Sequence, residues 1–128
     1  MGMKDLPVTW AEFDEAVRAI APHVDRSADW LYGVPRGGLA LAVALSHTTG
    51  IPLIMEPRRE MVLIDDIADS GATIRYFLDQ GWRPRQVMTW FRRVGCPVET
   101  AFSVRDVEAG LWVVFPWEAG KGCGHAGQ

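Results

Sequence analysis

The residues most suited to chemistry in this chain are two adjacent carboxylates followed closely by a third acid, two hydroxyls and a glycine. They lie in Val62-Leu-Ile-Asp-Asp-Ile-Ala-Asp-Ser-Gly-Ala-Thr73. The unpaired N–H groups that begin a helix, together with hydroxyls, can surround a phosphate, and glycine lets the backbone approach it closely. Asp65 and Asp66 could bind ribose hydroxyls directly or through a hydrated Mg²⁺. The order of these residues predicts one site for a phosphate and a sugar.

The elements that must hold these residues follow from the apolar pattern. Residues 61–64 are short and apolar, as in a buried strand, and residues 73–78 suit a helix, so residues 69–73 form the turn between them. For the turn alone, simple capping of a helix by Asp69 or Ser70 is the alternative. Two acids directly after the strand favour the ligand site.

A second candidate anion site precedes the acidic stretch. Trp30-Leu-Tyr-Gly-Val34 leads into Pro35-Arg-Gly-Gly38 and then into a small-residue helix. Gly37 and Gly38 permit a tight turn with exposed N–H groups, and Arg36 offers a fork of donors to phosphate oxygens. An isolated Arg-Gly-Gly is usually only a surface turn, so its place before the acidic strand gives it weight.

The remaining pattern predicts an α/β fold with a mostly parallel sheet flanked by helices. Expected helices span residues 10–21, 39–47 and 73–78, and expected strands span residues 30–34, 51–55, 61–64, 86–91 and 101–104. Ligands of such sheets gather at the carboxyl ends of the strands, where both candidate segments fall. The size of the chain indicates one domain, residues 1–119, and residues 120–128, with four glycines, are expected to form a disordered tail.

Composition excludes several classes of protein. The net charge of −3 argues against a general nucleic-acid surface, and no apolar run is long enough to span a membrane, so we expect a cytoplasmic protein. Cys96 and Cys123 lie outside any paired motif and indicate neither a disulfide scaffold nor a zinc site. Arginine pairs at 58–59 and 92–93 fall at expected turns or strand ends, where they could converge on phosphates or remain solvated.

The acidic stretch resembles the phosphoribosyl pyrophosphate signature of the type I phosphoribosyltransferases, and residues 35–38 resemble their pyrophosphate loop. Gly110-Leu-Trp-Val-Val-Phe-Pro-Trp-Glu118 is similar to the C-terminal hood segment with which the xanthine–guanine branch holds its base. The resemblance implies that family's fold and transfer of 5-phosphoribosyl from phosphoribosyl pyrophosphate to a 6-oxopurine (guanine, xanthine or hypoxanthine) in purine salvage. It also implies Mg²⁺ as cofactor and a homodimer or homotetramer.

The same resemblance implies roles for individual residues. Asp69 would be the catalytic acid or base near N7 of the purine, and Asp65 and Asp66 would hold Mg²⁺ directly or through water. Trp112 would stack on the base, with core packing as the alternative, whereas Trp117 is expected to pack structurally. A cis peptide bond is implied between Pro35 and Arg36. The residues expected to bind substrate are Arg36, Gly37, Gly38, Asp65, Asp66, Ser70, Gly71, Ala72, Thr73, Arg93, Trp112 and Val113.

The chain departs from the family pattern in its base pocket. Arg93 stands where the branch has a lysine facing the exocyclic oxygen of the base, and Val114 stands where relatives carry an acid. A guanidinium can bind a carbonyl with two donors but is bulkier than an ammonium. The preferred base is therefore left open.

A larger departure is the absence of the family's long mobile loop. Only Glu56-Pro-Arg-Arg-Glu60 joins the two strands that this loop normally separates. One hypothesis is that Arg58 and Arg59 replace the loop by reaching the pyrophosphate; a solvated turn is the alternative.

Two classes of function follow. The retained Asp65, Asp66, Asp69 and Arg36 favour an active purine phosphoribosyltransferase, and the missing loop favours a noncatalytic, regulatory protein that binds nucleotide or phosphoribosyl pyrophosphate. A phosphoribosyltransferase for a pyrimidine is a third reading, against which the hood similarity argues.

Overall fold

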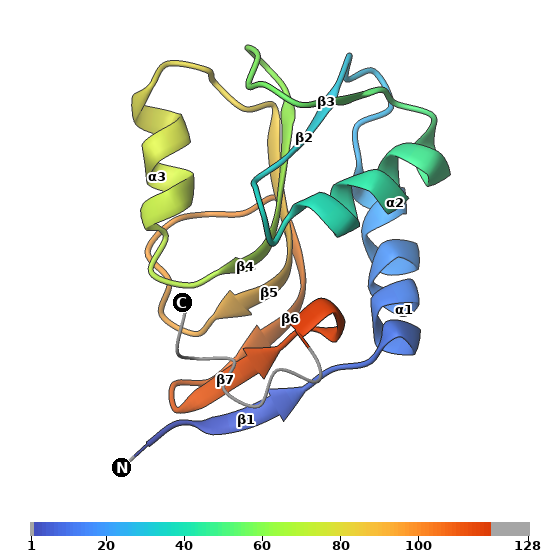
Figure 1. Cartoon of the computed structure of the whole chain (residues 1–128). Coiled ribbons are helices and arrows are strands. Elements are labelled where there is room, and N and C mark those ends of the chain that lie inside the picture. The colour runs from blue at the N-terminus through green and yellow to red at the C-terminus, as the bar shows by residue number, and fades with distance from the viewer. Residues whose placement is uncertain (1, 119–128) are drawn as a thin grey trace.

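The centre of the molecule is a five-stranded, wholly parallel sheet with the strand order β3-β2-β4-β5-β6. The structure is a computed structural model that describes residues 2–118. The five strands are β2 (Leu31–Gly33), β3 (Leu53–Ile54), β4 (Val62–Ala68), β5 (Gln86–Arg93) and β6 (Phe102–Val107). Helices α1 (Trp10–Ile20) and α2 (Leu39–Thr49) lie on one side of the sheet and α3 (Ala72–Asp79) on the other (Figure 1).

The continuous apolar run of β4 is explained by the helices that cover both faces of the sheet. Successive side chains of a strand point to opposite faces, so Val62 and Ile64 join the core under α1 and α2, whereas Leu63 joins the core under α3. Ile74 and Phe77 supply the buried side of α3. This packing fixes the position of the loop between β4 and α3.

A separate two-stranded parallel sheet lies below the main one and was not predicted. It pairs β1 (Lys4–Pro7) with β7 (Leu111–Val114), so that Asp5 lies opposite Trp112 (Figure 1). The chain then enters α1 through a capping box between Thr9 and Glu12, as expected. Two short 3₁₀ helices, η1 (Ala21–His23) and η2 (Pro116–Glu118), complete the described elements. The C-terminal segment that resembles the hood therefore forms β7 and η2, and β7 pairs with the N-terminal strand.

The expected α/β class is confirmed, and every expected helix and strand is present. One boundary changes the description of the site, because β4 continues to Ala68. Its pairing with β2 ends at Ile64, but its pairing with β5 continues from Asp65 opposite Thr89 to Ala68. Asp65 and Asp66 therefore lie within a strand and not directly after it as predicted.

Two expectations concern the ends and surface of the chain. Within residues 2–118, no helix has the length and apolar character needed to cross a membrane. The expected tail, residues 120–128, lies outside the described residues.

Candidate functional site

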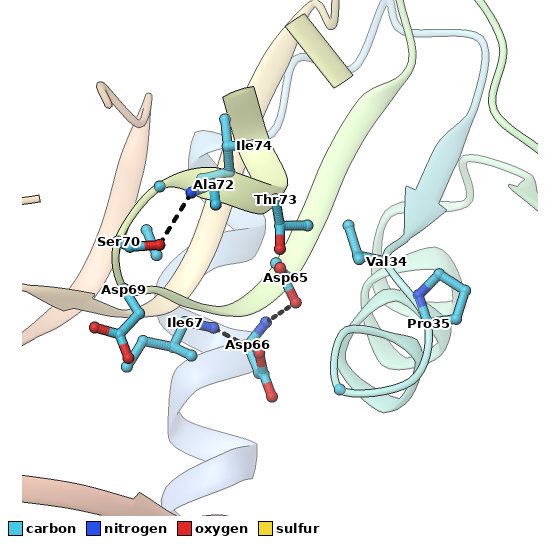
Figure 2. A pocket seen from close by; sticks show the side chains of 13 residues that line it. Val34, Pro35, Asp65, Asp66, Ile67, Asp69, Ser70, Ala72, Thr73 and Ile74 are labelled. Atoms are coloured by element: carbon cyan, nitrogen blue, oxygen red, sulfur yellow. Dashed lines mark hydrogen bonds between the residues drawn. The ribbon is translucent and has the colours of Figure 1, made fainter. Parts of the chain in front are cut away.

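A cavity of about 260 Å³ lies between the carboxyl ends of β2 and β4 and the start of α3 (Figure 2). Its wall combines the loop after β2, the acidic end of β4 and the turn that opens α3. The lining residues are Val34, Pro35, Gly37, Asp65, Asp66, Ile67, Ala68, Asp69, Ser70, Gly71, Ala72, Thr73 and Ile74. The two segments singled out by the sequence thus meet in one place, which we call the first cavity.

Residues 69–73 form the expected turn into a helix, which we call the cradle. Gly71 precedes α3 with a left-handed φ of 86°, and the amide of Ala72 donates to Ser70 Oγ at 3.2 Å. The first helical hydrogen bond runs from the Arg75 amide to the Gly71 carbonyl. The amides of Thr73 and Ile74 come before that bond, so helix geometry gives them no acceptor within α3. Both residues line the first cavity, where these amides can meet an anion.

The cradle is supported from behind by a loop that the sequence did not single out. The Arg92 guanidinium donates to the carbonyls of Val98 at 2.6 Å and Cys96 at 2.8 Å. A Cβ placed on Gly71 would lie 2.5 Å from Val98 Cγ2, so glycine is required here by packing as well as by φ. Arg92 therefore shapes the loop and does not reach toward the cavity as the arginine-pair expectation allowed.

The loop after β2 approaches the acidic strand with almost no space between them. The peptide bond from Pro35 to Arg36 is cis, as the resemblance implied. A Cβ on Gly38 would lie 2.5 Å from the Ile64 carbonyl oxygen, and one on Gly37 would overlap the Asp66 carboxylate. Arg36 is exposed, and both of its neighbours in sequence line the first cavity.

Asp65 and Asp66 are held close together and away from water. Asp65 Oδ1 accepts from the Asp66 amide and Asp66 Oδ1 from the Ile67 amide, both at 2.8 Å. Burial, and then the neighbouring Asp66 charge, raise the pKa of Asp65 to about 8, and burial also raises the pKa of Asp66. A cation or a hydroxyl donor beside the pair would favour its charged form.

A second cavity of about 200 Å³ adjoins the first. It is lined by Asp66, Ile67, Asp69, Arg93, Trp112, Val113, Phe115 and Glu118. Asp66, Ile67 and Asp69 line both cavities, so the segment from Asp66 to Asp69 forms their shared wall. Trp112 and Val113 of β7 thus lie where the resemblance placed base-binding residues.

The other tryptophan of the hood has a packing role, as expected. The Trp117 ring stacks on Phe115 with 5.0 Å between ring centroids and also contacts Trp10, Phe13 and Trp90. This aromatic cluster joins the hood to α1 and β5. It supports the second cavity from outside.

Arg93 lines the second cavity, but most of its donors are already bonded. Nε donates to Asp69 Oδ1 at 2.9 Å and Nη2 to Asp69 Oδ2 at 3.3 Å. Nη1 donates to the carbonyls of Glu108 at 2.8 Å and Leu111 at 2.7 Å. To contact a base as expected, Arg93 would have to share N–H donors that already form these hydrogen bonds.

The β3–β4 connection, which carries Arg58 and Arg59, lies at the opposite end of the sheet from the start of α3 (Figure 1). The Arg58 guanidinium lies 5.1 Å from the centroid of the Trp30 ring, and Arg59 Nη1 donates to the Gly81 carbonyl at 3.4 Å. Trp30 and Gly81 precede β2 and β5, so they mark the amino ends of the strands. The hypothesis that this pair reaches a pyrophosphate is wrong for this arrangement, because a connection between parallel strands must return to the amino edge.

No group of three or more acidic, histidine or cysteine side chains that could hold a metal ion occurs among residues 2–118. Asp65 and Asp66 provide two buried carboxylates beside the first cavity. Mg²⁺ commonly binds through one or two carboxylates, substrate phosphates and several waters. The pair fits a cation shared with substrate better than a cation held by protein alone.

Solved structures similar to this chain cover nearly its whole length. A purine phosphoribosyltransferase from Pyrococcus horikoshii Ot3 is 26% identical, with a TM-score of 0.76 over 91% of this chain and 95% of that chain. The Helicobacter pylori xanthine-guanine-hypoxanthine phosphoribosyltransferase is 18% identical, with a TM-score of 0.71 over 90% and 94%. A hypothetical protein from Neisseria gonorrhoeae with bound ppGpp is 16% identical, with a TM-score of 0.74 over 93% and 92%. No protein-family model and no curated protein sequence matches the chain.

Proposed function

We propose that this chain, which has the type I phosphoribosyltransferase fold, transfers 5-phosphoribosyl from phosphoribosyl pyrophosphate to a 6-oxopurine, as a cytoplasmic enzyme of purine salvage. The observation that carries this proposal is the pair of adjoining cavities that share Asp66, Ile67 and Asp69. One cavity has an anion cradle and two acids, and the other has an aromatic wall. A nucleoside monophosphate has the same division into phosphate, sugar and base.

In this proposal the first cavity holds the phosphorylated sugar. The amides of Thr73 and Ile74, with the hydroxyls of Ser70 and Thr73, bind the 5′-phosphate, as helix N-termini bind anions. Asp65 and Asp66 lie beside the cradle and bind the ribose hydroxyls or Mg²⁺. Asp65 and Asp66 would hold Mg²⁺ there, and a bound Mg²⁺ would supply positive charge to neutralise the leaving pyrophosphate.

The loop of residues 35–38 receives the pyrophosphate. The Gly37 backbone forms part of the wall of the first cavity, and Arg36, exposed between the lining residues Pro35 and Gly37, would supply a guanidinium. The bond from C1′ to the pyrophosphate oxygen breaks, and its electron pair leaves with the pyrophosphate. Donors aimed at that oxygen stabilise the transition state more than the ground state.

The second cavity holds the purine against Trp112. A purine nitrogen forms the new bond to C1′, and the base gives up one proton. The Asp69 carboxylate lies on the wall shared by the two cavities and can take that proton. Oxocarbenium character at C1′ is expected in the transition state, as at other glycosidic centres.

The direct test is turnover. The purified protein is incubated with phosphoribosyl pyrophosphate, Mg²⁺ and either guanine, xanthine, hypoxanthine or adenine, and the products are separated by chromatography. We expect the monophosphate of at least one 6-oxopurine and none from adenine. Absence of product from all four bases, with binding of phosphoribosyl pyrophosphate intact, would contradict the transferase proposal.

A second function is favoured by the short β3–β4 connection. Residues 55–61 return to the amino edge, so the long loop of the family is absent and Arg58 and Arg59 do not replace it. Enzymes commonly close such loops to exclude water from the reaction. The alternative is a noncatalytic protein that binds nucleotide or phosphoribosyl pyrophosphate as a regulatory ligand, and the similar Neisseria gonorrhoeae protein was solved with ppGpp bound. Nucleotide binding without turnover distinguishes this function.

A further inference from the structure

Arg93 joins three parts of the site that come from different places in the sequence. It leaves the carboxyl end of β5, its side chain is 13% exposed, and it forms part of the second cavity. Two of its nitrogens donate to the two carboxylate oxygens of Asp69. The third donates to the carbonyls of Glu108 and Leu111 at the turn that begins β7. The guanidinium therefore bridges the loop of the cradle and the hood.

Nearly all N–H groups of the Arg93 guanidinium already donate hydrogen bonds within the protein. Arginine has five N–H groups in a planar fork, one on Nε and two on each terminal nitrogen. The hydrogen bonds to Asp69 use the N–H group on Nε and one N–H group on Nη2. The hydrogen bonds to the two carbonyls use both N–H groups on Nη1. One N–H, on Nη2, is left. Arg93 therefore cannot offer a two-donor fork to a base carbonyl while it keeps these bonds.

The geometry also explains why an arginine stands at this position. The fork binds both oxygens of one carboxylate, while its other arm reaches two carbonyls on the opposite side. The three N–H groups of an ammonium radiate from one nitrogen and cannot span the same partners. Leu111 directly precedes Trp112, so the arm that holds the turn also fixes the start of the aromatic wall.

We propose that Arg93 is a positioning residue that orients the Asp69 carboxylate and locks it to the hood strand, and that it does not select the base by reading its 6-oxygen. The catalytic part of this inference rests on the proposed transferase function. The link between Asp69 and the hood does not depend on turnover. Base selection is then left to other groups of the second cavity.

The kinetic test uses Arg93→Lys, Asp69→Asn and the double variant, with Arg85→Lys as the control. Arg85 is a second arginine paired with an aspartate, Asp25, but at the amino edge of the sheet. We expect Arg93→Lys to lower kcat by roughly 10- to 100-fold for every accepted base, because Asp69 loses its orientation, with KM for phosphoribosyl pyrophosphate unchanged. In the Asp69→Asn background the same change should have a much smaller effect.

Two kinetic results would overturn the inference. One is a loss expressed as a raised KM for the base with kcat kept, which is the result expected if Arg93 binds the 6-oxygen of the base. The other is full additivity of the two substitutions. Arg85→Lys should match the wild type throughout.

A second measurement needs no turnover and separates failure of this inference from failure of the transferase proposal. Backbone amide resonances are recorded by NMR for the wild type, Asp69→Asn, Arg93→Lys and the double variant. Asp69→Asn should shift the resonances of residues 108–112 when Arg93 is present and leave them nearly unchanged in the Arg93→Lys background. Equal shifts in both backgrounds, or none in either, would show that Arg93 does not carry the link, whether or not the protein turns over.

Discussion

Asp69 is the residue whose side chain lies on the wall between the two cavities and is paired with Arg93 at 2.9 Å. This position suits a group that exchanges a proton with the base while the sugar is held on its other side. The residue was predicted from its place in a contiguous signature. Its partner was not, because the ion pair joins residues that only the folded sheet brings together.

Asp69→Asn tests the proton-transfer role at this position. Asparagine keeps the shape of the side chain but cannot accept the proton, so we expect product formation to fall by roughly 10²- to 10⁴-fold. Binding of ribose 5-phosphate, measured by calorimetry, should remain unchanged because the cradle amides are untouched. Asp79→Asn, at the far end of α3, is the control. Full activity in Asp69→Asn would remove the residue from the chemistry.

Asp65 should make stability depend on pH in a defined direction. Its pKa is about 8 in the folded protein against 3.8 for the ordinary group, so between these values the folded state holds a proton that the unfolded state has lost. The free energy of unfolding should therefore fall as pH rises from about 4 to 8, by at most about 1.4 kcal/mol per pH unit from this group.

The Asp65→Asn variant has no proton to lose at this position and should lack that part of the slope. Urea unfolding at pH 5 and pH 8 measures it. The free energy of unfolding of the variant, minus that of the wild type, should be more positive at pH 8 than at pH 5. Parallel pH dependence in the two proteins would mean that Asp65 is already ionised in the folded state.

At the scale of elements, the turn into α3 combines local and distant constraints. Its hydroxyls, its glycine and the helix that follows were predicted because they are neighbours in sequence. The loop of residues 94–98 behind it was not predicted, because Arg92 folds this loop back onto Gly71 through carbonyl contacts that leave no sequence pattern.

Gly71→Ala tests how closely this turn is packed. The substitution forces an L-residue to a φ of 86° and puts its Cβ 2.5 Å from Val98 Cγ2. We expect a loss of about 1–3 kcal/mol in the free energy of unfolding and a loss of ribose 5-phosphate binding. Gly50→Ala, at a φ of 79° with open space around it, is the matched control for φ alone.

Thermal unfolding and calorimetry of the two glycine variants separate the contributions. Gly50→Ala should be destabilised less than Gly71→Ala and should bind ribose 5-phosphate normally. Addition of Val98→Ala to Gly71→Ala should restore part of the stability, because it relieves the overlap but not the backbone conformation. Equal losses of unfolding free energy in Gly71→Ala and Gly50→Ala would show that the loop behind the cradle moves aside without a measurable cost in stability.

Two elements show the limits of sequence patterns. β1 is a short, mostly exposed strand that ends in proline, and its stability comes from pairing with β7 at the other end of the chain. The short β3–β4 connection was expected to carry Arg58 and Arg59 to the pyrophosphate, but it lies at the other end of the sheet. The parallel direction of β3 and β4 alone requires that this connection finish at the amino edge.

At the scale of the whole molecule, parallel strands bring the carboxyl ends of β2, β4 and β5 to one edge. The loop of residues 35–38, the acids, the turn into α3 and Arg93 all follow or end these strands, and the β1–β7 sheet closes the edge with Trp112. The general arrangement could be predicted because such sheets bind ligands at this edge. The division into two cavities could not, since it depends on how the hood packs against Asp66 and Asp69.

The central claim is that these two cavities form one site for the two halves of a purine nucleoside monophosphate. Calorimetric titration of GMP and of ribose 5-phosphate into the wild type, Thr73→Val and Trp112→Ala tests it most directly. We predict that GMP binds one to one and more tightly than ribose 5-phosphate, that Thr73→Val weakens both ligands, and that Trp112→Ala weakens GMP alone. Equal affinity of the wild type for the two ligands, or GMP binding that neither substitution changes, would contradict the account.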